Sequence, residues 1–456
     1  MQPASDVTVQ PPTSGWPTRA HTAGPFARET RCLLHLPDDR PVIMSGHQAE
    51  LWHPGIAAKA MIARAAADNA GGIAAWITVD QDANDPTQIP YPTHNLRMAT
   101  WSLASVPKGA KASLPAVGTR EPLRSISAAL SDAHPALQSA LQRLATTVSK
   151  HAASANLATQ FSAAAFEPLG ELARTDATIL ATSLIKTPIF AAALELMLAD
   201  PLVCAATYNA AVADVPAARL RPLVATESRI ELPLWRLRPG IARTPVFAHD
   251  LASIPREQLA PRALLMTALL RAAACDVFIH GTGGGIYDRA TDAWWFAWLN
   301  SSHSPSPAAQ SLNEHPLAPT AVVTATRRLN FPGVIVPAPE QIDRAVWQAH
   351  RSLHDPAILG DADLATAKRD LANQIALAPR RSSQRRQLYR QMHVLVAQMR
   401  TARSSDIAAA KQAADEAIKS RELASVVHAR TWPCTYYPRS TLEELCYTLT
   451  RTLKST

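Results

Sequence analysis

The chain has 456 residues, of which 47% are hydrophobic and 18% are charged. This balance predicts a folded protein of about two structural units with a large core, and it excludes a disordered chain. The net charge of +8 is modest for this length, so it favours an anionic ligand without requiring nucleic acid.

Cysteine usage and apolar segments bear on the cellular compartment. Five scattered cysteines without a Cys-x-x-Cys pair argue against a structural zinc site and a disulfide framework, and we expect no metal. The start of the chain lacks the pattern of a secretory signal, and charged residues interrupt the longest apolar region, 187–215. We therefore expect a protein of the reducing cytoplasm, with neither nucleic acid nor membrane as a partner.

Residues 1–40 are polar and proline-rich, which predicts an N-terminal extension on the core. Val42–Met44 predicts a short strand that ends in a polar turn. Good helix formers fill Ala57–Asp68, Gly71 ends the helix, and Ile73–Val79 is typical of a buried strand. The segment is thus a strand–helix–strand unit, which opens an α/β core over residues 41–338.

Parallel strands joined in this way bind ligands beyond their carboxyl ends, and both ends are polar here. His47 is a candidate general acid or phosphate ligand, Asp80 and Asp82 are candidates for binding an amine or moving a proton, and His53 can face an anion at the helix start. The plainer alternatives are turn residues bonded only to the backbone. The candidate residues of this unit are Ser45, Gly46, His47, Gln48, His53, Asp80 and Asp82.

The residue composition changes along the middle of the chain. Residues from about 122 to 215 are rich in Ala and Leu and predict a helical insertion, whereas 220–250 reads as short strands separated by prolines. A helix is expected over Pro261–Ala274 and a strand over Cys275–His280. A further strand, Ala321–Ala325, follows.

A glycine-rich segment, 281–285, follows the predicted strand and is the second candidate site. Glycines let a ligand approach the backbone and offer N–H groups to an anion. The segment matches neither a Walker A loop nor a dinucleotide fingerprint. We expect an anion-binding loop, with a base or a clamping residue nearby, and structural roles are the alternative. The candidates are His280, Gly283, Gly284, Gly285, Asp288 and Arg327.

Residues 339–430 are helical by pattern, with Asp355-Pro356 and Ala378-Pro379 as breaks. Apolar residues from Leu388 onward keep a heptad spacing, which predicts either a coiled-coil-like arm or a plain amphipathic bundle. A homodimer through this arm is a candidate assembly. Residues 431–456 are expected to return to the core, with a last helix that opens on a capping box at Ser440–Glu443.

These motifs resemble the cysteine-adding enzymes of bacillithiol biosynthesis. The resemblance is carried by a strand–turn–helix–strand order, a glycine-rich segment and a C-terminal Pro-containing segment. The matching positions are Gly46, His47, Gln48, Pro54, Lys59, Trp76, Ile77, Asp80, Asp82, Gly283, Gly284, Gly285, Asp288, Tyr437, Pro438 and Arg439.

The resemblance implies an α/β fold with a Rossmann-like parallel-sheet core related to the nucleotidyltransferases. It also implies a ligase or transferase that joins the carboxylate of cysteine to the amine of a glucosaminyl-malate conjugate. An adenine nucleotide is the candidate cofactor implied by the relatives of this fold. The expected partners are therefore small molecules, namely cysteine and an amino-sugar conjugate.

Three positions depart from the family pattern. His47 stands where the family has Gln, Gln81 where it has His, and Met266 where it has Arg. The substrate or the reaction can therefore differ while the fold is kept. Two alternatives follow, a nucleotidyltransferase-like enzyme on another small molecule and a non-catalytic scaffold that uses the arm through Leu388 and Leu395.

Overall fold

The computed structural model describes residues 7–16, 25–106, 124–239, 241–301, 312–313 and 316–454. The chain divides into two compact units. We call the first the core unit, comprising Met1–Tyr91, Ala99–Arg327 and Arg430–Thr456, and the second the arm unit, comprising Pro92–Met98 and Arg328–Ala429. The predicted arm, 339–430, falls within the arm unit except for its last residue.

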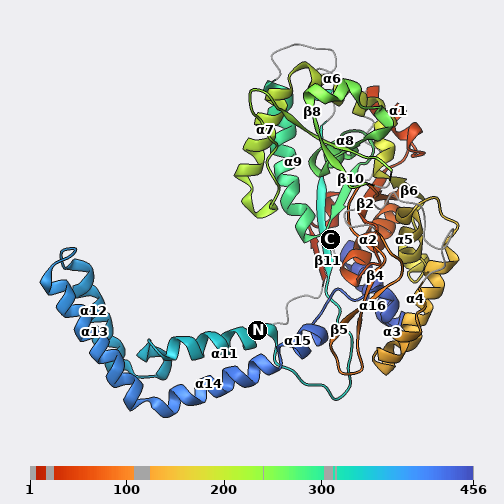
Figure 1. Cartoon of the computed structure of the whole chain (residues 1–456). Coiled ribbons are helices and arrows are strands. Elements are labelled where there is room, and N and C mark those ends of the chain that lie inside the picture. Colours follow the sequence, from red (N-terminus) through yellow and green to blue (C-terminus); the bar gives the residue numbers. More distant parts are fainter. Residues whose placement is uncertain are drawn as a thin grey trace. The chain divides into compact units, whose positions relative to one another are not determined.

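A six-stranded sheet forms the centre of the core unit (Figure 1). Its order is β1-β11-β10-β2-β3-β6, and all neighbours are parallel except β1, which pairs antiparallel with β11. The fold is therefore mixed α/β with a mostly parallel central sheet, as the sequence predicts. The strands are Val7–Gln10 (β1), Val42–Gln48 (β2), Ile73–Val79 (β3), Ala177–Leu180 (β6), Val277–His280 (β10) and Thr320–Ala325 (β11).

The chain leaves two adjacent strands in opposite directions. Helix α2, Pro54–Ala70, leads from β2 to β3, whereas α9, Thr282–Ser301, leads from β10 to β11 on the other side. Since such crossovers are right-handed, the two helices belong to opposite faces of the sheet. The carboxyl ends of β2 and β10 thus flank a topological switch point, where ligands bind in open α/β sheets.

Both faces of the sheet are closed by apolar packing. Helix α2 is buried along most of its length, begins with Pro54 and ends at Gly71, whose φ is +63°. On the other face Leu270 of α8, Ala263–Ala273, joins a core cluster with Met44 and Phe278. Small alanines in α2 and long side chains in α8 therefore fill the two layers beside the sheet.

The structure changes three details of the sequence-based description. The first strand does not end at Met44 but continues to Gln48, because every residue from Val42 onward pairs with β3. The N-terminal extension contributes an edge strand, β1, and helix α1, Pro25–Leu33, to the core. The insertion 122–215 is not purely helical, because β6 adds a strand beside β3. Each difference comes from non-local pairing, which local pattern does not report.

The glycine-rich segment is also different from the expectation. Gly283, Gly284 and Gly285 do not form a loop, because α9 begins at Thr282 and they make up its first turn. A Cβ on Gly285 would lie 2.3 Å from Cγ2 of Val322 in β11. The glycines therefore allow the helix to start directly against the sheet, a packing requirement that outweighs their low helix propensity.

Other elements of the core unit surround this centre. The predicted strands near 220–250 and the predicted helix after Pro261 are present. The last helix begins at Arg439, one residue before the predicted start at Ser440. A small sheet has the order β8-β7-β9. The bounds are Gln88–Pro92 (β4), Met98–Ser102 (β5), Ser127–Asp132 (α3), Gln138–Lys150 (α4), Leu157–Phe166 (α5), Pro188–Ala199 (α6), Pro201–Asp214 (α7), Glu231–Arg236 (β7), Thr244–Phe247 (β8), Leu259–Pro261 (β9) and Arg439–Lys454 (α16).

No single helix among the described residues is both long and apolar enough to cross a membrane. Helices α6 and α7 pass such a test only as a pair, and they are bent by 103° at the break between them. Both helices contribute buried residues to a core cluster, among them Phe190, Leu196 and Tyr208.

The arm unit consists of paired helices. Helix α11 packs on α14, and α12 packs on α13 through Ile375 and Leu388. The predicted breaks are present, since Asp355 caps a short 3-10 turn and α12 ends at Leu377 before Ala378. The helices are Pro339–Ser352 (α11), Ala362–Leu377 (α12), Ser383–Ala402 (α13), Ser404–Lys419 (α14) and Arg421–Val427 (α15).

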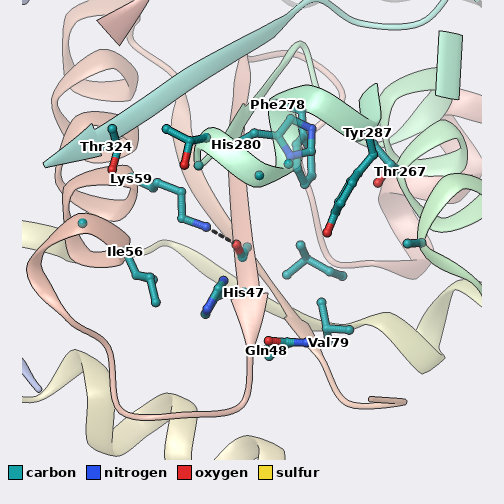
Figure 2. A pocket seen from close by; sticks show the side chains of 18 of the residues that line it. His47, Gln48, Ile56, Lys59, Val79, Thr267, Phe278, His280, Tyr287 and Thr324 are labelled. Atoms are coloured by element: carbon teal, nitrogen blue, oxygen red, sulfur yellow. Dashed lines mark hydrogen bonds between the residues drawn. The ribbon is translucent and has the colours of Figure 1, made fainter. Parts of the chain in front are cut away.

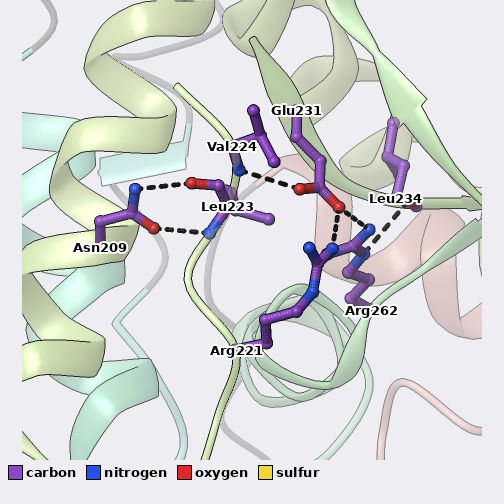
Figure 3. A network of polar contacts seen from close by, with 7 residues as sticks. All are labelled: Asn209, Arg221, Leu223, Val224, Glu231, Leu234 and Arg262. Carbon is purple, nitrogen blue, oxygen red and sulfur yellow. Dashed lines mark hydrogen bonds and ion pairs between the residues drawn. The ribbon is translucent and has the colours of Figure 1, made fainter. Parts of the chain in front are cut away.

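A buried carboxylate joins three elements of the core unit (Figure 3). Glu231 of β7 is fully buried, and one of its oxygens accepts from both Arg221 and Arg262. Its other oxygen accepts from the Val224 N–H at 2.9 Å. Burial alone would raise the pKa of Glu231, but these donors outweigh it and the pKa is lowered. The carboxylate therefore stays charged and fixes the segment before β7.

We predict that Glu231→Gln strongly destabilises the core unit. The substitution leaves the buried Arg262 without its counter-charge, so the free energy of unfolding should fall by about 3 kcal/mol. Urea denaturation followed by circular dichroism measures this change. Glu227→Gln, at an exposed position nearby, is the matched control and should shift the value by less than about 0.5 kcal/mol. Equal effects of the two substitutions would contradict the role assigned to Glu231.

Candidate functional site

A cavity of about 380 Å³ opens at the switch point of the central sheet, within the core unit (Figure 2). It is lined by the ends of β2, β3, β10 and β11, the first turns of α2 and α9, and the start of α8. This volume suits a small molecule. We call this cavity the switch-point pocket.

The switch-point pocket brings together candidates from both predicted sites. Those that line it are Gly46, His47, Gln48, His53, Asp82, His280, Gly283 and Gly284. The candidates that do not line it are Ser45, Asp80, Gly285, Asp288 and Arg327. Residues from sequence positions more than 200 apart therefore meet at one edge of the sheet.

The candidates outside the pocket have structural contacts. Ser45 donates from Oγ to the carbonyl oxygen of Ile279 at 2.8 Å, which ties β2 to β10. Asp80 accepts from the Thr182 N–H at 2.9 Å and from Thr182 Oγ1 at 2.5 Å. Burial raises the pKa of Asp80, although the bonds from Thr182 oppose the shift. Because side chains alternate along a strand, neighbours of a pocket residue can point away from the pocket.

The first turn of α9 presents an open, electropositive helix end to the pocket. Its first helical hydrogen bond runs from Gly285 N to Gly281 O at 3.1 Å, so the N–H groups of Thr282, Gly283 and Gly284 precede the helical ladder. A Cβ on Gly283 would meet nothing within 4 Å. This end can therefore receive an anion directly on the backbone.

The first turn of α2 is different because it caps itself. His53 Nδ1 accepts from the Gly55 N–H at 3.0 Å, and the His53 carbonyl accepts from Ile56 N and Ala57 N. Pro54 has no N–H to offer. Helix α2 thus adds the field of its dipole to the pocket, whereas α9 adds free donors.

Lys59 is the principal residue that the pattern analysis did not include among the candidates. It is only 4% exposed, and its Nζ donates to the Gly46 carbonyl at 2.5 Å and lies 5.4 Å from the Trp76 ring centroid. Burial lowers the pKa of Lys59 to about 7, opposed in part by Glu50. A single lysine within an apolar helix was the signal that could have identified it.

Two histidines of the pocket are neutral near pH 7. Burial lowers the pKa of His47, although Glu50 Oε1 lies 2.8 Å from its Nε2 and opposes the shift. Burial and the neighbouring His47 lower the pKa of His53 to about 4. Arg430 and the protonated form of Lys59 therefore supply the positive charge of the pocket.

The opposite wall carries Asp82, which is held by two partners. Gln48 Nε2 donates to one carboxylate oxygen, and Arg243 Nη2 lies 2.9 Å from the other. The guanidinium of Arg243 also lies over the ring of Trp235, 4.5 Å from its centroid. This wall is therefore polar and held in place. It presents the carboxylate of Asp82, which can accept from an amine, beside the side-chain amide of Gln48.

Two of the positions that depart from the family pattern touch each other. Gln81 Nε2 lies 3.4 Å from Met266 Sδ, and it donates to the Pro261 carbonyl at 3.2 Å. Met266 lines the pocket and Gln81 does not. Further pocket residues that the sequence reasoning did not select are Lys59, Thr267, Phe278, Tyr287, Thr324 and Arg430.

Comparisons with known proteins add no identity to this geometry. No protein-family model matches the chain, and no curated protein matches it significantly. The resemblance to the cysteine-adding enzymes therefore depends on the motifs alone. Among the described residues, no three His, Cys, Asp or Glu side chains are grouped so that they could hold a metal ion.

We predict that anion binding weakens with rising pH through Lys59. The protonated amine attracts the anion, so affinity should be constant below the pKa of about 7 and fall above it. Sulfate is the probe because its own charge is constant from pH 6 to 9, and the melting midpoint at graded sulfate concentrations reports affinity.

Lys59→Met should remove this pH dependence, while Lys186→Met, at an exposed position outside the pocket, should preserve it. Sulfate affinity that stays the same between pH 6 and 9 in the unmodified chain would contradict the prediction.

We predict that Asp80 stabilises the fold without contacting the ligand. Asp80→Ala leaves two donors of Thr182 unpaired, so the free energy of unfolding should fall by about 1–2 kcal/mol. Sulfate affinity should stay within a factor of about 3, because Asp80 does not line the pocket. A larger change in affinity would indicate that Asp80 contributes to ligand binding.

Proposed function

We propose that this chain is an enzyme that binds a small anionic substrate in the switch-point pocket and joins it to an amine. The observation that carries the proposal is that the open end of α9 and the buried Lys59 line the same cavity. Backbone N–H groups, a helix dipole and an ammonium group together suit a carboxylate or phosphate.

The finer proposal is a cysteine-adding ligase or transferase. In this reading α9 and Lys59 hold the anionic group of one substrate, and Asp82 with Gln48 lies where the amine of the other would bind. A carboxylate condenses with an amine only after activation, for which an adenine nucleotide is the proposed cosubstrate. The motif resemblance and the mostly parallel sheet with its switch point support this reading.

The proposal extends to the fold relation, the assembly and the cellular location. A Rossmann-like core related to the nucleotidyltransferases fits the parallel strand order. Exposed apolar residues of the arm unit, such as Leu377, Tyr389 and Val394, support a homodimer through the arm. A cytoplasmic enzyme of small-molecule metabolism is consistent with all of these features.

The alternative is a nucleotidyltransferase-like enzyme on another small molecule. The open end of α9 favours it, because a helix N-terminus at a switch point is a common place for nucleotide phosphates. Mg²⁺-dependent binding of a nucleoside triphosphate, without any effect of cysteine, would favour this alternative. A scaffold without catalysis predicts instead that pocket substitutions have no effect on the organism.

We predict that loss of this gene changes the thiols of its source organism. Extracts with and without the gene are labelled with a fluorescent thiol reagent and compared by mass spectrometry. The cysteinyl-glucosaminide thiol should be absent from the mutant, and its precursor without cysteine should accumulate. Complementation with the unmodified gene should restore the thiol, whereas a Lys59→Met gene should not.

The control gene carries Lys186→Met, which should restore the thiol fully because the residue lies outside the pocket. An unchanged thiol profile would exclude cysteine addition for this chain. The nucleotidyltransferase-like alternative would then be tested directly, with purified protein, cysteine, an amine acceptor and ATP.

A further inference from the structure

His280 ends β10 with its imidazole in the switch-point pocket (Figure 2). One ring nitrogen, Nε2, is buried and lies 2.8 Å from Oδ2 of Asp288, within ion-pair distance although the angle is not that of a hydrogen bond. The other nitrogen, Nδ1, lies beside Gly284 in the first turn of α9, and both His280 and Gly284 line the pocket. The two ring nitrogens thus have separate environments, one next to a carboxylate and one next to a glycine at the cavity.

The carboxylate behind His280 is itself held in place. Asp288 is 4% exposed in α9, and Arg271 Nη1 of α8 lies 3.2 Å from its Oδ1. Arg271 is anchored in turn by the Ala318 carbonyl at 2.7 Å and by Asp292 at 2.6 Å. Burial alone would raise the pKa of Asp288, but His280 and Arg271 outweigh it and the pKa is lowered.

A charged Asp288 selects one tautomer of His280. A carboxylate can only accept, so it favours the proton on Nε2 and leaves the lone pair on Nδ1. The charged or titratable groups on the elements around the ring are Asp288 and Tyr287 on α9, Arg271 on α8, Lys59 on α2 and His47 on β2. Of these, Asp288 lies in direct contact with the imidazole.

A glycine at position 284 lets the first turn of α9 pass close to Nδ1 of His280 without a side chain over it. A Cβ on Gly284 would lie 2.5 Å from Nδ1 of His280. Any other residue at this position would therefore push against the nitrogen or displace the ring. Gly283, one residue earlier, has open space where its Cβ would be, so the requirement is specific to Gly284.

We propose that His280 is the general base of the switch-point pocket and that Asp288 is its positioning residue. The inference rests on the proposed function, which supplies an amine to be deprotonated. The amine nitrogen bonds to an acyl carbon activated by the adenine nucleotide, and the bond from that carbon to its phosphate-type leaving group breaks. The amine proton passes to Nδ1, and Asp288 stabilises the imidazolium that results.

The first test needs no substrate. Diethyl pyrocarbonate reacts with unprotonated, accessible imidazole nitrogens, and peptide mass spectrometry follows each histidine of the full chain over time. His280 should be modified, with the exposed His249 as internal reference. Gly284→Ala should slow modification of His280 by about tenfold or more, whereas Gly283→Ala should leave its rate near that of the unmodified chain.

Resistance of His280 in the unmodified, folded chain would overturn the inference, as would equal rates in the two glycine variants. Circular dichroism and the melting midpoint of each variant confirm that the compared proteins are folded. This test is independent of the proposed reaction, so its failure is distinguishable from the absence of cysteine-adding activity.

The second test uses the steady-state kinetics of the proposed reaction, with cysteine, the amine acceptor and ATP. His280→Gln should lower kcat by about 10²-fold or more with little change in KM. Asp288→Asn should lower kcat by about tenfold or more with little change in KM, because an asparagine no longer selects the tautomer that carries its proton on Nε2. Asp292→Asn is the matched control, since Asp292 also pairs with Arg271 but is half exposed, whereas the carboxylate paired with His280 is that of Asp288.

A kcat that is unchanged in Asp288→Asn, or lowered equally in Asp292→Asn, would overturn the positioning role. If the unmodified chain shows no turnover, the proposed function is contradicted independently of the role of His280. The carbethoxylation rates then decide whether Nδ1 is a basic, accessible nitrogen. A pair that only joins β10 to α9 structurally would leave both the carbethoxylation rates and the ratio of kcat to KM effects unchanged.

Discussion

The close approach of α9 to the central sheet is the constraint on which the pocket depends. Gly284 lies directly over His280, and Gly285 lies directly over Val322, so side chains at these positions would force the helix outward. With glycines there, the helix begins at the sheet edge and directs its free N–H groups into the cavity. The glycines therefore create an anion site through packing, because they bring a helix end close to the strands.

Buried charges in this protein fall into two kinds, distinguished by how completely their partners satisfy them. Glu231 receives three donors away from the cavity and fixes the segment before β7. Lys59 donates a hydrogen bond to the Gly46 carbonyl, and its ammonium group borders the cavity. Because a buried charge without a counter-charge is unfavourable, Lys59 gains most from an anionic ligand. The same reasoning separates Asp80, which is satisfied by Thr182, from the pocket.

The positions that differ from the cysteine-adding enzymes are coupled in space. Gln81 and Met266 contact each other, so the two changes replace a pair of polar residues by an amide and a thioether in van der Waals reach. Met266 borders the cavity, and this wall is therefore more apolar than the resemblance implies. A change confined to one wall leaves the open end of α9 and Lys59 in place.

The sequence by itself determined the elements with strong local signals. Pro54 and Gly71 delimit α2, and the change in composition after the helix marks the strands that follow. Asp355 and Ala378 break the arm helices where expected. Tertiary structure alone decided which polar residues meet, because strand pairing and side-chain direction depend on distant partners. Ser45 turns toward β10 while Gly46 borders the cavity, and no local pattern distinguishes them.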